Sequence, residues 1–193
     1  MQATWLVGDL ARDANELGSF LAAGGARSLV GAFSVQLSAA LEAAAAVEAA
    51  TAAAAGSSSG LRMRRAALRA AEDRAASAAA AIAQAIVAMC CVAEDADGAA
   101  ALVTAGACGL PMCNKQEISR HPLAASSSAG AIPPVVLAIE RHADTDIAVA
   151  EAGPRAVDFL LRQPFDDAVV AAARLSFVTC GGAPCLVKLL RST

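Results

Sequence analysis

Cysteine and histidine are the residues of this sequence whose spacing comes nearest to a reactive or metal-binding arrangement. Two pairs of cysteines have four residues between their members, and two histidines are available: Cys108 with Cys113, Cys180 with Cys185, His121 and His142. Such side chains could bind zinc or carry thiol redox chemistry. Structural zinc sites usually have closer, paired cysteines, and free cysteine is commonly buried as a small apolar residue. We therefore expect packing, with no metal and no cofactor, and keep a thiol-based redox or metal protein as an alternative.

Signatures of an enzyme active site are missing from the sequence. It has no phosphate-binding glycine loop, no dinucleotide-binding fingerprint and no nucleophile elbow. His121 precedes a proline and His142 fits a helix end, so neither has an evident partner that would activate a nucleophile. Paired aspartates stand where helices should begin and are expected to cap them: Asp144 with Asp146, and Asp166 with Asp167. We expect no catalytic residues and no enzymatic activity.

The most distinctive charged stretch is the arginine-rich segment "LRMRRAALRAAEDR". Arg62, Arg65 and Arg69 are three and four residues apart, so a helix places them on one face, where they could bind an acidic segment of a partner protein. The alternative is a solvated face balanced by Glu72 and Asp73, and runs of charge are usually of that kind.

The composition favours helices and argues against some kinds of partner. Hydrophobic residues make up 57% of the chain, much of it alanine, while aromatic residues make up 3%. Alanine has the highest helix propensity, whereas strands are rich in β-branched and aromatic residues, so we expect an all-α fold. The net charge of −3 and the scarcity of aromatic rings argue against nucleic-acid binding.

The amino-terminal segment and the cysteines bear on localisation. "MQATWLVGDLARD" has charged residues where a signal peptide needs an uninterrupted apolar stretch, and the six cysteines lack the dense framework of small secreted domains. We expect a cytoplasmic or nuclear protein with reduced thiols. The uncharged stretch 75–93 is long enough to span a membrane, but its larger side chains lie on one side at helical spacing. We expect a buried helix there and no membrane association.

Serine and glycine interruptions divide the chain into helical blocks within a single domain of residues 1–193. "GSSSG" at 56–60 marks an internal break, and a loop is expected near 121–130. Between about 17 and 55, we expect a glycine corner at Gly24 and Gly25 followed by two helical stretches. One long helix is expected from 61 to about 95.

Beyond residue 97, the sequence predicts shorter helices that turn at glycines: Gly106, Gly130, Gly153 and the pair Gly181-Gly182. In "SAGAIPPVVLAIERH", Gly130 can adopt the positive φ of a helix exit. Pro133 and Pro134 can occupy the first turn of the next helix, where an amide proton has no partner in any case. The glycine and the two prolines therefore predict a corner between stacked helices.

The same order of residue types recurs in "EAGPRAVDFLLRQ" (151–163) and "TCGGAPCLVKLLRS" (179–192). These segments resemble the junction between the first and second helices of armadillo repeats, whose usual form is close to "xxGAIPxLVxLLRS". "NKQEIS" (114–119) is similar to that family's first helix and "DDAVVAAARLSFV" (166–178) to its third. The resemblance covers about 97–193 and is weaker before it.

The resemblance implies an armadillo-like α-solenoid, a right-handed superhelix of short stacked helices. In that family the third helices line a groove that holds extended peptides, commonly through a ladder of asparagines. This sequence departs from the pattern, because its only asparagines are Asn15 and Asn114. We expect a non-enzymatic scaffold that binds a protein partner through its concave or terminal face. Small-angle scattering would distinguish an elongated solenoid from a compact bundle.

The last helix, "APCLVKLLRST", is expected to present Leu186, Leu189 and Leu190 on one face. Nothing after it in the sequence covers that face as a terminal cap would. This predicts a longer natural protein, docking of another subunit, or self-association through the carboxyl-terminal helix. A second function class stays open, in which the protein is a structural or assembly subunit whose alanine-rich helices form a self-associating bundle.

Overall fold

The computed structural model describes residues 13–55, 61–105, 130–162 and 167–192. Of these residues 90% are helical and none is in a strand, which confirms the all-α class. The helices, in chain order, are α2 (Ala14–Ala22), α3 (Gly25–Ala55), α4 (Leu61–Ala93), α5 (Ala96–Thr104), α7 (Ile132–His142), α8 (Ile147–Arg162), α9 (Asp167–Thr179) and α10 (Gly182–Ser192).

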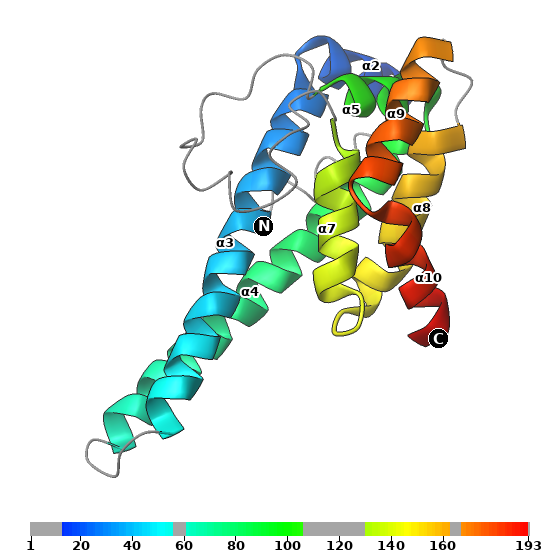
Figure 1. Cartoon of the computed structure of the whole chain (residues 1–193). Coiled ribbons are helices and arrows are strands. Elements are labelled where there is room, and N and C mark those ends of the chain that lie inside the picture. The colour runs from blue at the N-terminus through cyan, green and yellow to red at the C-terminus, as the bar shows by residue number, and fades with distance from the viewer. Residues whose placement is uncertain (1–12, 56–60, 106–129, 163–166, 193) are drawn as a thin grey trace.

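Two long helices, α3 and α4, form an antiparallel hairpin on which the rest of the fold is built (Figure 1). The long helix expected from residue 61 is confirmed. The two helical stretches expected before it are wrong, because Gly25–Ala55 is one helix of 31 residues. Its alanines favour helix throughout, and the low helix propensity of Gly31 alone is too small to end the helix.

The core surrounds the second half of α4. Ile82, Ile86 and Met89 are fully buried there, as the helical spacing in 75–93 predicted. They share one contiguous apolar cluster with Phe33 of α3 and Leu160 of α8. Helices α5, α7, α8, α9 and α10 gather beside this half of the hairpin, while the end near residues 56–60 projects beyond them (Figure 1).

Glycines with positive φ form three of the corners. Gly24, Gly130 and Gly181 have φ of 79°, 53° and 82°, as expected for exits from a helix. Pro133 and Pro134 lie in the first turn of α7, so that corner is confirmed.

The corner expected at Gly153 is wrong, because Gly153 and Pro154 lie inside the continuous helix α8. A Cβ on Gly153 would stand 2.5 Å from Ile139 Cγ1 of α7. The glycine thus permits α7 and α8 to approach closely, which outweighs the preference of Gly and Pro for helix ends.

The expected capping by aspartates is confirmed at Asp146. Its Oδ1 accepts hydrogen bonds from the amides of Ala148 at 2.9 Å and Val149 at 3.4 Å, which begins α8. The expected cap at Asp144 is wrong. Its Oδ2 instead forms an ion pair with Nζ of Lys188 in α10, at 3.1 Å. Asp166 and the side chain of Asp167 lie outside the described residues.

Candidate functional site

The predicted arginine stripe begins α4, at the projecting end of the hairpin. Arg65 and Arg69 are exposed and form no ion pair with the described part of the chain, and the side chain of Arg62 is not described. Figure 1 shows this end of α4 apart from the carboxyl-terminal helices. The structure therefore does not join the arginines and the α10 leucines into one site.

The three leucines of α10 differ in their surroundings. Leu189 is half-buried and packs against the apolar cluster, while Leu190 is 77% exposed. Leu186 is also half-buried. One face of α10 therefore contributes to the fold, and Leu190 marks the face that is turned outward.

Exposed apolar side chains lie on both α9 and α10. Leu175 and Val178 of α9 are each 65% exposed, and Val187 of α10 is also exposed. Each pair, Leu175 with Val178 and Val187 with Leu190, is three residues apart and lies on one side of its helix. The opposite sides contact α7, and the axes of the two helices are bent by 64°. We define these four side chains as the α9–α10 face.

Sequence reasoning missed three of these four residues. The spacing of Leu175 and Val178 in "RLSFVT" was available as a signal. It could not be used, because a helix with apolar residues on more than one side does not reveal which side meets the core. Among the described side chains of α9, the small residues Ala173 and Ser176 are the buried ones.

Basic side chains border the α9–α10 face. Arg174 and Arg191 are exposed and make no ion pair with the described residues, whereas Lys188 is neutralised by Asp144. An apolar face with two unpaired guanidinium groups at its border favours an apolar partner surface that carries carboxylates.

Among the described cysteines, Cys90 and Cys185 are buried in the core and Cys180 packs against it. The Sγ of Cys185 is buried and donates to the carbonyl of Val136 at 3.8 Å. Burial raises the pKa of Cys180 and Cys185, and raises that of Cys90 to about 11, so these groups are thiols at neutral pH. The thiolate is the nucleophile and the metal ligand, so this arrangement does not favour redox or metal chemistry.

Within the described ranges, no three His, Cys, Asp or Glu side chains come together as a metal site would require. Cys108, Cys113 and His121 lie outside those ranges. His142 ends α7 as predicted, and its Nε2 is buried without a hydrogen-bond partner among the described groups.

Acidification is expected to destabilise the wild type more than the His142→Gln variant. Burial lowers the pKa of His142 below 6.5, and Arg141 lowers it further, while Asp146 opposes the shift. The unfolded chain therefore binds a proton that the folded state does not, so the free energy of unfolding falls as the pH drops through about 6.5. Urea unfolding at about pH 7.5 and about pH 5 measures this difference. An equal loss of stability in both proteins would contradict it.

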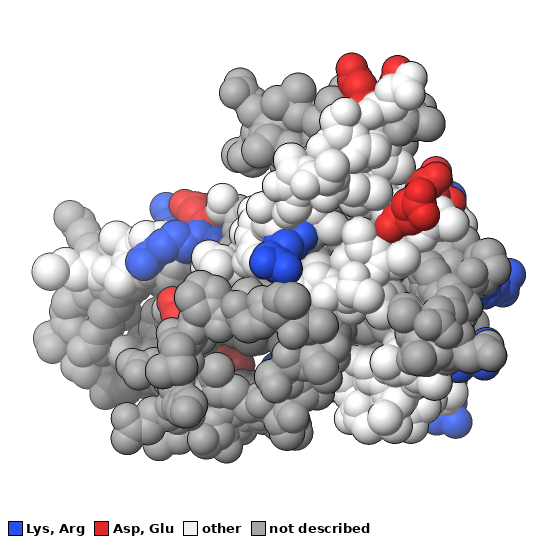
Figure 2. Space-filling view, turned by 90° about the horizontal axis from the view of Figure 1, so that it is seen from above, with Lys and Arg blue, Asp and Glu red and all other residues white. Residues whose placement is uncertain are grey.

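Charge is sparse on the face of the molecule in Figure 2. The described Lys, Arg, Asp and Glu side chains there stand in small separate groups on an otherwise uncharged surface. This face offers no broad basic field among its described atoms of the kind that attracts a phosphate backbone.

Two helical stretches are long and apolar enough to cross a membrane by length and composition, Gly25–Ala53 and Arg65–Ala93. The bent pair α9 and α10 would be a third if it counted as one span. In the fold, 44% of the most apolar window in the α4 stretch is buried inside the protein, against 22% for the α3 stretch. The fold thus uses part of this apolar surface for its own core.

The α9–α10 face therefore stands as the best-supported candidate site, on geometry alone. Comparisons of the chain with protein-family models, curated proteins and solved structures gave no match.

Proposed function

We propose that this protein is a non-enzymatic scaffold that binds another protein through the α9–α10 face. The observation that carries the proposal is the outward position of four large aliphatic side chains on two consecutive helices. Complete burial of such a side chain contributes about 1.5–3 kcal/mol, and these four are only partly buried, so a partner could gain the remainder. Clustered apolar side chains on a surface commonly mark interaction sites.

The chemistry of the face indicates the kind of partner. Leu175, Val178, Val187 and Leu190 would receive the apolar side of an amphipathic helix. Carboxylates beside that side would meet Arg174 and Arg191. We propose such an acidic amphipathic helix as the partner segment, in a cytoplasmic or nuclear setting where the thiols stay reduced.

We further propose that α7 to α10 are arranged as in armadillo repeats. Support comes from α7, which begins after Gly130 with prolines in its first turn, and from α10, which follows Gly181 in the same manner. The uncovered side of α9 and α10 is the side on which a stacked array would add its next helices. Binding there would use the surface that stacking leaves open.

Selection from a library of displayed peptides tests the proposal. We expect the selected peptides to have apolar residues at helical spacing with neighbouring Asp or Glu. The Val178→Asp, Val187→Asp double variant is expected to bind them at least tenfold more weakly, because each added carboxylate must be desolvated.

The matched control is Val35→Asp, which places the same charge on an exposed valine of α3. It should leave the affinity unchanged. Selected peptides that bind the double variant as tightly as the wild type, measured by fluorescence anisotropy, would refute the assignment of this face.

A further inference from the structure

We propose that the projecting end of the α3–α4 hairpin pairs face to face with the same end of a second copy of this chain, to form a four-helix bundle. We call this end the arm and define it as residues 39–55 of α3 and 61–78 of α4. The inference does not depend on the α9–α10 face, and it gives a structural basis to the assembly role that the alanine-rich composition suggests.

The arm lacks a core of its own. Among its described side chains, only Ala40 and Ala71 are buried, although both helices continue through it. Hairpins of two helices bury little apolar surface, and most helical stability in proteins comes from packing against further elements. The arm therefore has a side that an additional pair of helices would stabilise.

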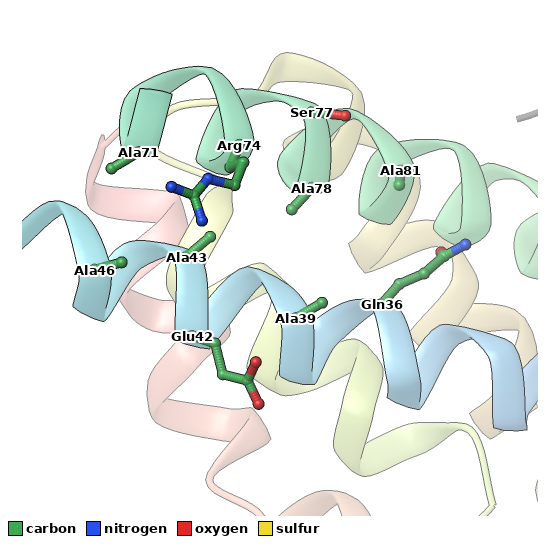
Figure 3. A pocket seen from close by; sticks show the side chains of 10 residues that line it. All are labelled: Gln36, Ala39, Glu42, Ala43, Ala46, Ala71, Arg74, Ser77, Ala78 and Ala81. Atoms are coloured by element: carbon green, nitrogen blue, oxygen red, sulfur yellow. The ribbon is translucent and has the colours of Figure 1, made fainter. Parts of the chain in front are cut away.

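A shallow groove of about 560 Å³ lies between α3 and α4 at the base of the arm, over residues 36–46 and 71–81 (Figure 3). Its lining is mostly alanine, which lets other helices approach closely. The residues that line it are Gln36, Ala39, Glu42, Ala43, Ala46, Ala71, Arg74, Ser77, Ala78 and Ala81. The other helices visible in Figure 3 lie behind this groove.

Charge is divided between the two helices of the arm. The α3 part carries Glu42 and Glu48 and no basic residue. The α4 part carries five arginines against two acidic residues, Glu72 and Asp73. The acidic helix of one copy is thus complementary to the basic helix of another.

Glu42 and Arg74 line the same groove without forming an ion pair with each other. Figure 3 shows Arg74 reaching from α4 toward α3 above Ala43, while Glu42 points away from α4. The Nε of Arg74 instead donates to the carbonyl of Ala70 in its own helix. Both charges therefore remain available at the edges of the groove.

A two-fold axis parallel to the arm would bring the oppositely charged helices of two copies together. It places α3 of each copy against α4 of the other at the same level along the arm. Because the hairpin is antiparallel, Glu42 and Arg74 stand near one another along its length, so Glu42 of each copy meets Arg74 of the second copy. The contact is self-complementary, which favours a second copy over an unrelated protein.

A lipid bilayer fits the arm less well than a second copy does. Glu42, Glu48, Arg65 and Arg69 are exposed on it, and a bilayer would have to remove these charges from water. The most apolar side chains of α4, such as Ile82 and Ile86, lie in the core instead. A dimer of arms would leave most of the charges at the rim.

Sedimentation velocity on the full chain tests the proposal. Specific interfaces bury about 1,000 Å² or more in total, and we expect a contact confined to the arm to be close to this limit, as a reversible dimer with a dissociation constant in the micromolar range. Glu42→Arg and Arg74→Glu, each alone, should weaken the dimer at least tenfold because like charges then face each other at both contacts. Glu151→Arg, an equal charge change on α8 away from the arm, should not.

An equimolar mixture of the two variants decides the geometry. One copy then has arginine at both positions and the other glutamate at both, so the opposite charges meet again and the mixture should regain the wild-type dimer. A wild type that is monomeric up to about 100 µM, or a mixture that stays monomeric, would overturn the proposal. So would a monomer that floats with phosphatidylcholine and phosphatidylglycerol vesicles, which would assign the arm to a membrane.

The Val178→Asp, Val187→Asp variant separates this inference from the scaffold function. It should retain the dimer while losing the selected peptides. Loss of the dimer in that variant would place the contact on the α9–α10 face and overturn the pairing of arms.

Discussion

Gly130→Ala is expected to lower the free energy of unfolding by about 3 kcal/mol or more, an amount that includes about 1–2 kcal/mol for a left-handed backbone at a residue with a Cβ. Gly130 has φ of 53°. A Cβ on it would stand 2.1 Å from the carbonyl oxygen of Val103 and 2.6 Å from that of Leu102. Because both are backbone atoms of α5, the corner or the helix must move.

The movement would also disturb a hydrogen bond that ties the two segments together. The amide of Ala131 donates to the carbonyl of Leu102 at 3.1 Å, directly beside the crowded position. Denaturant titration followed by circular dichroism measures the loss, as a change in midpoint at an unchanged slope.

Gly31→Ala is the control for the glycine prediction. Gly31 lies inside α3 with ordinary helical φ and open space where its Cβ would be. Alanine is therefore expected to stabilise the protein there by about 0.5–1 kcal/mol. Equal effects at Gly31 and Gly130 would show that the α5–α7 corner is wrongly described.

Phe33→Ala is expected to destabilise the protein by about 3–5 kcal/mol, the usual range for truncation of a fully buried phenylalanine. Phe33 has no exposed surface and belongs to the cluster that joins α3 to α4, α5 and α7. The chain has few aromatic residues and many alanines, so the neighbouring side chains have little volume with which to fill the cavity.

Val35→Ala provides the comparison for Phe33, two residues away on the opposite side of the same helix. Val35 is 68% exposed, so its truncation should change the free energy of unfolding by less than about 0.5 kcal/mol. Thermal and urea unfolding of both variants measure the contrast. Comparable losses in the two would mean that α3 packs with a different face toward α4.

Several local features could be predicted from the sequence because they depend on neighbouring residues alone. The helix that starts at residue 61, the Gly24 and Gly130 corners and the Asp146 cap are of this kind. Each follows from helix propensity, from the freedom of glycine at positive φ, or from a side chain that caps the next amides.

Gly153 shows where local reasoning fails. The order glycine then proline predicts a helix boundary, yet α8 continues through both residues. The deciding contact is Ile139 of α7, which takes the space that a Cβ on Gly153 would occupy. Ile139 belongs to another helix and meets Gly153 only in the folded chain, so the sequence could not reveal this contact.

The candidate sites show the same contrast between what the sequence predicts and what the tertiary structure decides. The sequence by itself determined that the protein is helical, that α10 has an apolar side and that α4 begins with arginines, because each of these depends on residue type and spacing within one helix. Only the tertiary structure decided that Leu189 faces inward and Leu190 outward, that α9 also has exposed apolar side chains, and that Glu42 and Arg74 line one groove. The physical reason is that a helix fixes which residues share a side, while the helices packed against it fix which side meets water.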